Sequence, residues 1–134
     1  MRGSNQSEED GPPVYAVRFA EAVQDEIDQE YARLAGISDV DVAESWDRGL
    51  LEAIRSLATY PKRCAIAPED QYFQRVRPGT PLRVLIYRRT RTGPAWRILF
   101  SVNEADSLDP RTVRVRHVWH GARSPITEWP AEDE

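Results

Sequence analysis

Arginine side chains are concentrated in one part of the chain. Residues 71–123 contain eleven arginines, three acidic residues and no lysine. The guanidinium group is planar and presents a fork of N–H donors that matches phosphate and carboxylate oxygens, whereas lysine offers only a point charge. This concentration favours the binding of a polyanion or an acidic peptide. The alternative is that the arginines only solvate the exposed side of a sheet.

The net charge of the whole chain hides this separation. The 134 residues carry 18 basic and 22 acidic side chains, a formal charge of -4. Residues 1–70 sum to -8, residues 71–123 to +8 and residues 124–134 to -4. A chain of this length has room for one domain around one core, so we expect a single site.

Three runs in the arginine-rich segment have the pattern of consecutive antiparallel strands. Leu82 to Arg88, Ala95 to Val102 and Thr112 to Trp119 are rich in β-branched and aromatic residues, with Gly, Pro, Asn and Asp between them. Apolar residues alternate along each run, and this predicts one core face made of Leu82, Val84, Ile86, Trp96, Ile98, Phe100, Val102, Val113, Val115 and Trp119. His117 has the same parity and is expected in or beside the core. The opposite face is predicted to carry most of the positive charge, from Arg83, Arg97, Arg114 and Arg116.

The segment before these strands is predicted to form one strand and two helices. Residues 14–19 alternate as a short strand does. Helical spacing follows in Phe19, Val23, Ile27, Tyr31 and Leu34, and again in Val42, Trp46, Leu50, Ala53 and Leu57. Ser38 with Asp41 resembles a capping box for the second helix, which stops before Pro61. The predicted fold is α+β, in the order β-α-α-β-β-β, with an antiparallel helix hairpin followed by a three-stranded antiparallel meander.

Composition suggests the boundaries of the domain and its surroundings. Residues 1–13 are predicted to be a disordered extension, and an origin of part of it in an expression tag is left open. The domain spans residues 14–123, and residues 124–134 form an acidic tail. Cys64 is the only cysteine, which fits a reducing compartment and offers no zinc site. No apolar run approaches the roughly 20 residues that cross a bilayer. We expect a soluble cytoplasmic protein without metal or cofactor.

Several short motifs, in their order along the chain, resemble a known family. They are Val14-Tyr15, Trp46 with Leu50, Ala53, Ile54 and Leu57, Pro61, Arg63-Cys64, Ala67-Pro68-Glu69, Arg83 to Arg88, and Val118 to Arg123. Together they resemble the RelE/ParE superfamily of bacterial type II toxin-antitoxin toxins, also called plasmid stabilisation proteins, over about residues 14–123. The resemblance implies a compact α+β toxin that a small antitoxin inactivates through an acidic amphipathic segment.

Two mechanisms occur in that superfamily, and the fold does not select between them. In the ParE-like branch the toxin binds DNA gyrase and traps it on cleaved DNA, without chemistry of its own. The Ile86-Tyr87-Arg88 and His120-Gly121-Ala122-Arg123 motifs are more similar to this branch. The side chains that we expect to contact the target or nucleic acid are Arg75, Arg77, Arg83, Tyr87, Arg88, Arg114, Arg116 and Arg123.

In the RelE-like branch the toxin enters the ribosome and cleaves messenger RNA, which requires a base, an acid and cations that stabilise phosphate charge. Arg83 and Arg123 stand where that branch places its phosphate-binding arginines. The tyrosine that it uses falls on Trp129, which has no ionisable hydroxyl. His120 is the substitute, because its ordinary pKa of about 6.5 suits acid or base work, although a capped surface histidine is the alternative. A third possibility is a nucleic-acid-binding module without toxicity.

Overall fold

The computed structural model describes residues 14–104, 111–122 and 129–130. Its elements, in chain order, are β1 (Ala16–Phe19), α2 (Val23–Ile37), α3 (Val40–Arg55), the 3-10 turns η1 (Ser56–Ala58) and η2 (Pro61–Arg63), β2 (Ala65–Ile66), α4 (Asp70–Phe73), β3 (Leu82–Arg88), β4 (Ala95–Asn103) and β5 (Thr112–His120). The predicted order of one strand, two helices and three strands is confirmed. The connection between the helices and the meander also contains β2 and the one-turn helix α4, which the sequence pattern did not predict.

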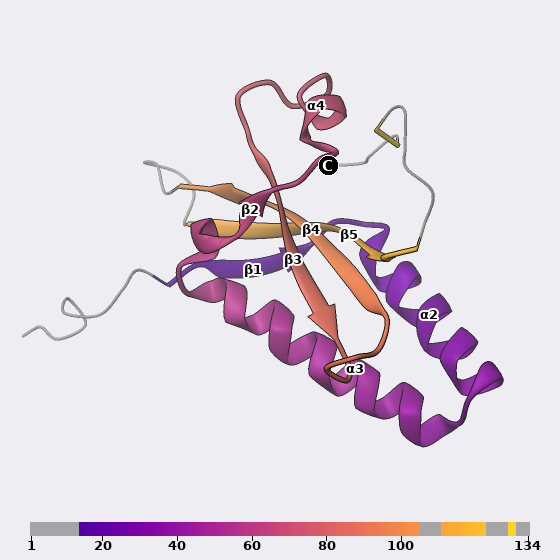
Figure 1. The fold of residues 1–134 in the computed structure, drawn as a ribbon. Coiled ribbons are helices and arrows are strands. Elements are labelled where there is room, and N and C mark those ends of the chain that lie inside the picture. The colour runs from indigo at the N-terminus through magenta and orange to yellow at the C-terminus, as the bar shows by residue number, and fades with distance from the viewer. Residues whose placement is uncertain (1–13, 105–110, 123–128, 131–134) are drawn as a thin grey trace, which may run out of the picture.

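The five strands form one mixed sheet in the order β1-β5-β4-β3-β2. The predicted antiparallel meander of β3, β4 and β5 is its centre. β1 joins β5 in parallel, with Ala16 opposite Thr112, and the two-residue β2 pairs antiparallel with the start of β3. The antiparallel helices α2 and α3 lie side by side along one side of this sheet (Figure 1).

The helices bury the apolar stripes that the sequence predicts. The buried residues are Val23, Ile27 and Leu34 of α2 and Ala43, Trp46, Leu50 and Ile54 of α3. They pack in a first cluster with sheet residues that include Trp96, Ile98, Phe100, Val113 and Val115. One detail of the prediction is wrong: the carboxylate that caps α3 belongs to Asp39, not Ser38, and it accepts the amide of Val42 at 2.8 Å. The helix therefore begins one residue later than the capping pattern suggests.

The other side of the sheet has a second, smaller hydrophobic cluster. It consists of Ala67, Phe73, Leu82, Leu99, Trp119 and Trp129. The predicted assignment of β3 is therefore wrong, because Leu82 and Val84 belong to this second side, Ile86 is exposed, and Leu85 and Tyr87 pack with the helices instead. Where both faces of a strand are partly covered, the parity of its apolar residues does not tell which face meets the helices.

A β-bulge in β5 changes the face that each later residue occupies. Leu99 pairs with His117 whereas Phe100 pairs with Val115, so Arg116 is the extra residue. Beyond it, Val118 packs with the first cluster and Trp119 with the second. His117 is buried, as predicted, but it stacks on Trp119 at 4.4 Å on the second side.

Some predictions fall outside the described residues. These are the disordered extension 1–13, Arg123, and the acidic tail apart from Trp129 and Pro130. None of the helices within the described ranges has the length and apolar character that crossing a membrane requires.

Candidate functional site

Arg83 is anchored to backbone carbonyls near the start of β3. Its Nη1 donates hydrogen bonds to the carbonyl oxygens of Cys64, at 2.7 Å, and Lys62, at 3.3 Å. By alternation along β3, Arg83 shares the helix side of the sheet with Leu85. The prediction that it shares one face with the arginines of β4 and β5 is therefore wrong, for the reason given above for the parity of β3.

Tyr87 is a core residue. Its side chain is buried, and its hydroxyl donates to the carbonyl oxygen of Trp46 at 3.0 Å. Burial raises the pKa of its phenol, so it stays protonated near neutral pH. Gly49 allows this contact, because a Cβ at that position would lie 2.2 Å from the hydroxyl oxygen. Tyr87 was expected to contact the target, but its hydroxyl is occupied in holding β3 against α3.

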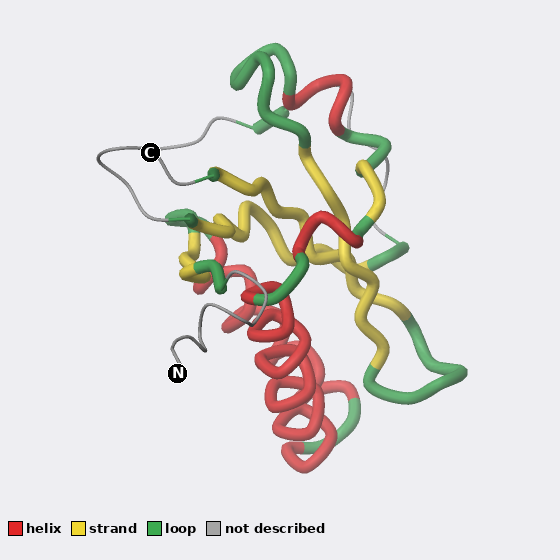
Figure 2. Tube along the Cα trace, turned by 90° about the vertical axis from the view of Figure 1, so that its left-hand side faces the viewer, coloured by secondary structure: helices red, strands yellow, loops and turns green. Residues whose placement is uncertain are grey.

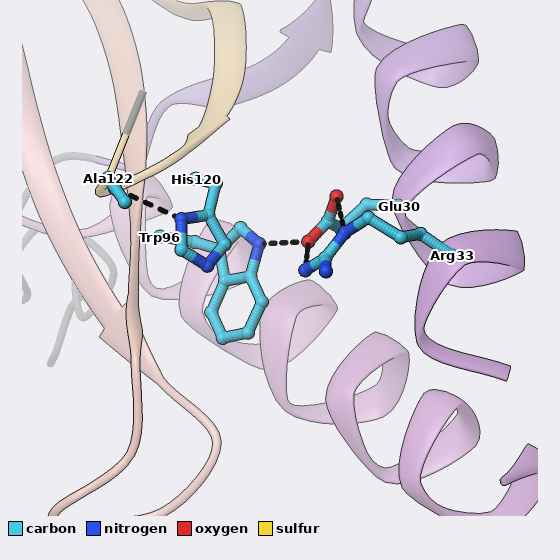
Figure 3. A network of polar contacts seen from close by, with 5 residues as sticks. All are labelled: Glu30, Arg33, Trp96, His120 and Ala122. Atoms are coloured by element: carbon cyan, nitrogen blue, oxygen red, sulfur yellow. Dashed lines mark hydrogen bonds and ion pairs between the residues drawn. The ribbon is translucent and has the colours of Figure 1, made fainter. Parts of the chain in front are cut away.

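His120 lies at the end of β5, beside a small pocket. Its Nδ1 accepts the amide hydrogen of Ala122 at 3.0 Å, and its ring meets the ring of Trp96 edge-on at 5.2 Å (Figure 3). The pocket has a volume of about 250 Å³ and is lined by Glu26, Gln29, Glu30, Val118, Trp119 and His120. The side chain is only partly exposed, which combines the predicted capped histidine with a place in a concave surface.

Glu30 supplies negative charge next to His120. Its carboxylate accepts hydrogen bonds from Trp96 Nε1, at 2.8 Å, and from Arg33 (Figure 3). Burial acts to raise the pKa of Glu30, but the hydrogen bonds from Arg33 and Trp96 outweigh it, so its pKa is lowered and it stays ionised. A carboxylate and an imidazole that line one pocket can take part in proton transfer. The charge of this carboxylate is, however, already neutralised by Arg33.

Arg83 and His120 do not share a site. Arg83 pairs with Phe100 of β4, whereas His120 pairs with Trp96. Their positions are therefore about 13 Å apart along β4 and about 10 Å apart across the sheet. The guanidinium of Arg83 also points to the carbonyls that precede β2, on the side of β3 away from β5. Arg123, the third proposed catalytic residue, lies outside the described residues.

The arginines of β4 and β5 are largely occupied in the fold. Arg97 forms a bidentate ion pair with Glu69, with one contact of 2.6 Å, and both side chains are mostly buried. Arg116 is 2% exposed, donates to Ser101 Oγ at 3.1 Å and lies over the ring of Phe73. Arg116 was predicted to contact a target, but its guanidinium is enclosed in the fold and does not reach the surface. Arg114 lies on the same side by alternation and is partly buried.

Among the predicted contact residues that the structure describes, two are exposed. Arg75 lies over the ring of Tyr72 at 5.7 Å, and Arg88 lies at the end of β3. Arg77, just after α4, is partly buried. The sequence therefore marked a basic region correctly but did not tell which arginines reach the surface.

Sequence reasoning missed the role of Glu26. Its carboxylate lies 2.6 Å from His117 Nδ1 and accepts hydrogen bonds from the amide of Val118 and from Trp119 Nε1. β1 ends opposite Val115, and within the described residues no strand pairs with the rest of that edge of β5. Glu26 accepts the backbone amide of Val118 there in place of a strand. Within α2 it is one of several acidic residues, and no pattern in the sequence distinguishes it.

The fold and the comparisons agree on the class of protein. Residues 17–125 match the family described as ParE toxin of type II toxin-antitoxin system, parDE. Among solved structures, a chain described as "Chromosomal ParDE TA system from P. aeruginosa" has a similar fold, with a TM-score of 0.54 and 12% identity, over 80% of this chain and 96% of that chain. No curated protein sequence matches. The structure is thus that of a RelE/ParE superfamily toxin. Within that class, the chain belongs to the ParE toxin family of type II toxin-antitoxin systems.

Proposed function

We propose that this chain inhibits bacterial growth by binding DNA gyrase and that a cognate antitoxin neutralises it. The observation that carries the proposal is the separation of the candidate catalytic residues. His120 stands in a pocket at one end of β5, whereas Arg83 is fixed to the Lys62 and Cys64 carbonyls near β2. A gyrase inhibitor needs a binding surface and no catalytic constellation, so this arrangement and the family membership support it over a nuclease.

The proposed antitoxin contact follows from the charge of the exposed arginines. Arg75 and Arg88 are on the surface, and the residues around them, from 71 to 103, contain no acidic side chain. These two guanidinium groups would attract the carboxylates of an acidic antitoxin segment. Because gyrase acts in the bacterial cytoplasm and the antitoxin is made in the same cell, the proposed action is cytoplasmic.

Messenger RNA cleavage is the second candidate, because one observation favours it. His120 faces the ionised Glu30 in a pocket, as a proton-transferring histidine often does. Cleavage also requires a cation on the phosphate. The described residues that line this pocket include no arginine, and the guanidinium next to it, that of Arg33, is paired with Glu30.

Two assays run side by side test the proposal. The purified chain is added to gyrase and ATP with relaxed plasmid, and separately to a cell-free translation reaction whose messenger RNA is mapped by primer extension. We expect loss of supercoiling, accumulation of cleaved plasmid and intact message. His120→Asn, which keeps an acceptor near the position of Nδ1 but does not transfer protons near neutral pH, should inhibit gyrase like the parent. Ribosome-dependent cuts that disappear in His120→Asn would reject the gyrase proposal in favour of the nuclease.

A further inference from the structure

The loop between β3 and β4 presents an exposed cluster of positive charge. Arg88 is the last residue of β3, and Arg89 and Arg91 follow it in the loop. All three side chains are exposed. The surrounding segment, residues 81–103, has five arginines and no acidic residue. Arg83 and Arg97 are held in the sheet, so the exposed charge of this segment comes from Arg88, Arg89 and Arg91.

The loop has a defined conformation. The amide of Gly93 donates to the carbonyl of Thr90 at 3.2 Å, which closes a four-residue turn. Arg88 Nη1 donates to the carbonyl of Gly93 at 2.6 Å and ties the turn to the end of β3. A Cβ at Gly93 would lie 2.5 Å from Thr90 Oγ1, so a side chain at this position would require the threonine hydroxyl to rotate away. The loop is therefore held in place by its own hydrogen bonds.

Two of the guanidinium groups are available to a partner. Within the described part of the chain, Arg89 and Arg91 form no hydrogen bond or ion pair. The loop stands clear of the helices (Figure 2). Asp47 and Glu52 of α3 lie near its base, where they act on Tyr87 together with Arg89. A polyanion can therefore approach the loop from the side away from the acidic helices.

We propose that Arg89 and Arg91 contact the phosphate backbone of duplex DNA. This inference rests on the proposed gyrase function, in which the DNA is the segment that gyrase holds. Arginine matches phosphate with a bidentate fork. At this end of the sheet β5 still runs beside β4, with His120 opposite Trp96 and the amide of Gly121 bonded to the carbonyl of Ala95, so the loop itself is the part that extends toward a partner. Duplex DNA is the occupant that we expect, because it is the nucleic acid that gyrase holds and its phosphates form a continuous line of negative charge. Arg88 stabilises the turn, while Arg89 and Arg91 bind the phosphate groups.

The test compares two double variants that remove the same charge. Arg89→Gln with Arg91→Gln changes the loop, and Arg48→Gln with Arg55→Gln removes two exposed arginines from α3. Binding of the full chain to a short fluorescein-labelled DNA duplex is measured by anisotropy between about 50 and 200 mM salt. For the loop variant, the slope of log affinity against log salt should fall by about two, with at least about tenfold weaker binding at the lower salt. The α3 variant should bind like the parent, and circular dichroism confirms that both variants fold.

The outcomes separate this inference from the proposed function. Equal binding by both variants, or an equal loss in both, would overturn the loop contact even if the parent inhibits gyrase. So would a loss confined to duplex RNA in a parallel titration, because the partner would then be RNA. If the loop variant loses DNA binding as expected but the parent does not inhibit gyrase, the loop contact stands and the gyrase proposal fails.

Discussion

The two sides of the sheet are both covered, but by different chemistry. On the helix side, the cover is apolar: Trp46 and Leu50 of α3 pack on Ile98 and Phe100 of β4. On the other side, α4 covers only part of the sheet, and Phe73 packs with Trp119 and Trp129. Arginines complete this second side, with Arg116 over Phe73 and Arg97 paired with Glu69.

This difference shows that the number of arginines in a segment does not measure its surface charge. A long arginine stem can cover apolar area, and its guanidinium is tolerated in a buried place when polar partners accept its hydrogens. Ser101 and Glu69 are such partners for Arg116 and Arg97. The arginines that remain for binding are those of the loops, such as Arg89 and Arg91.

The largest expected effect contrasts one tryptophan from each side. Trp46→Ala should lower the free energy of unfolding by about 4 kcal/mol, because the side chain is fully buried in contact with Trp96 and leaves a closed cavity. Trp129→Ala should cost about 2 kcal/mol, since Trp129 itself lies outside the helices and the sheet, and water can enter the space. Urea unfolding followed by circular dichroism measures both values. Equal losses would show that the two clusters are equally closed.

The contact between α3 and β3 gives the next effect. Gly49→Ala should destabilise by about 2 kcal/mol, because the added Cβ displaces the Tyr87 hydroxyl, although alanine normally stabilises a helix by about 1 kcal/mol over glycine. In a Tyr87→Phe background the same change should cost less than about 1 kcal/mol. Gly36→Ala is the matched control, since nothing lies within 4 Å of its added Cβ, and it should not destabilise. Thermal unfolding of the four variants completes the cycle.

The ion pair on the second side predicts a pH dependence. The hydrogen bond from Arg97 lowers the pKa of Glu69 against the effect of burial. Because the folded pKa is depressed, this contribution is fully present above the ordinary carboxyl pKa of about 4.3 and is lost as pH falls through the folded value. Glu69→Gln should therefore be less stable than the parent by about 1 kcal/mol at pH 7, and the gap should shrink below pH of about 4. Exposed Glu52→Gln, as control, should show no such convergence in urea titrations at both pH values.

The smallest effect tests the start of α3. Asp39→Ala removes the side-chain acceptor for the Val42 amide and should cost about 1 kcal/mol. Ser38→Ala, the change at the position that the sequence pattern favoured as the cap, should cost only a few tenths of that. Chemical denaturation resolves the difference, and the reverse order would restore Ser38 as the cap.

Local patterns in the sequence predicted most of the elements. Val23, Ile27 and Leu34 lie on one stripe because a helix repeats every 3.6 residues, and the runs around β3, β4 and β5 are recognisable because strands repeat every two. The same patterns, with the order of the motifs, sufficed to indicate the toxin superfamily. Short-range periodicity depends only on neighbouring residues, so the sequence alone carries it.

The tertiary structure decided which face each strand residue occupies and which charges remain free. The bulge at Arg116 moved Trp119 to the second side. The register of β3 on β4 put Leu82 opposite Ser101 and so on the second side, whereas the alternation had placed it with Trp96. Arg83 donates hydrogen bonds to carbonyl oxygens 19 and 21 residues earlier in the chain. These outcomes depend on long-range pairing and on competition between possible partners, and a one-residue change of register reverses every side chain that follows it.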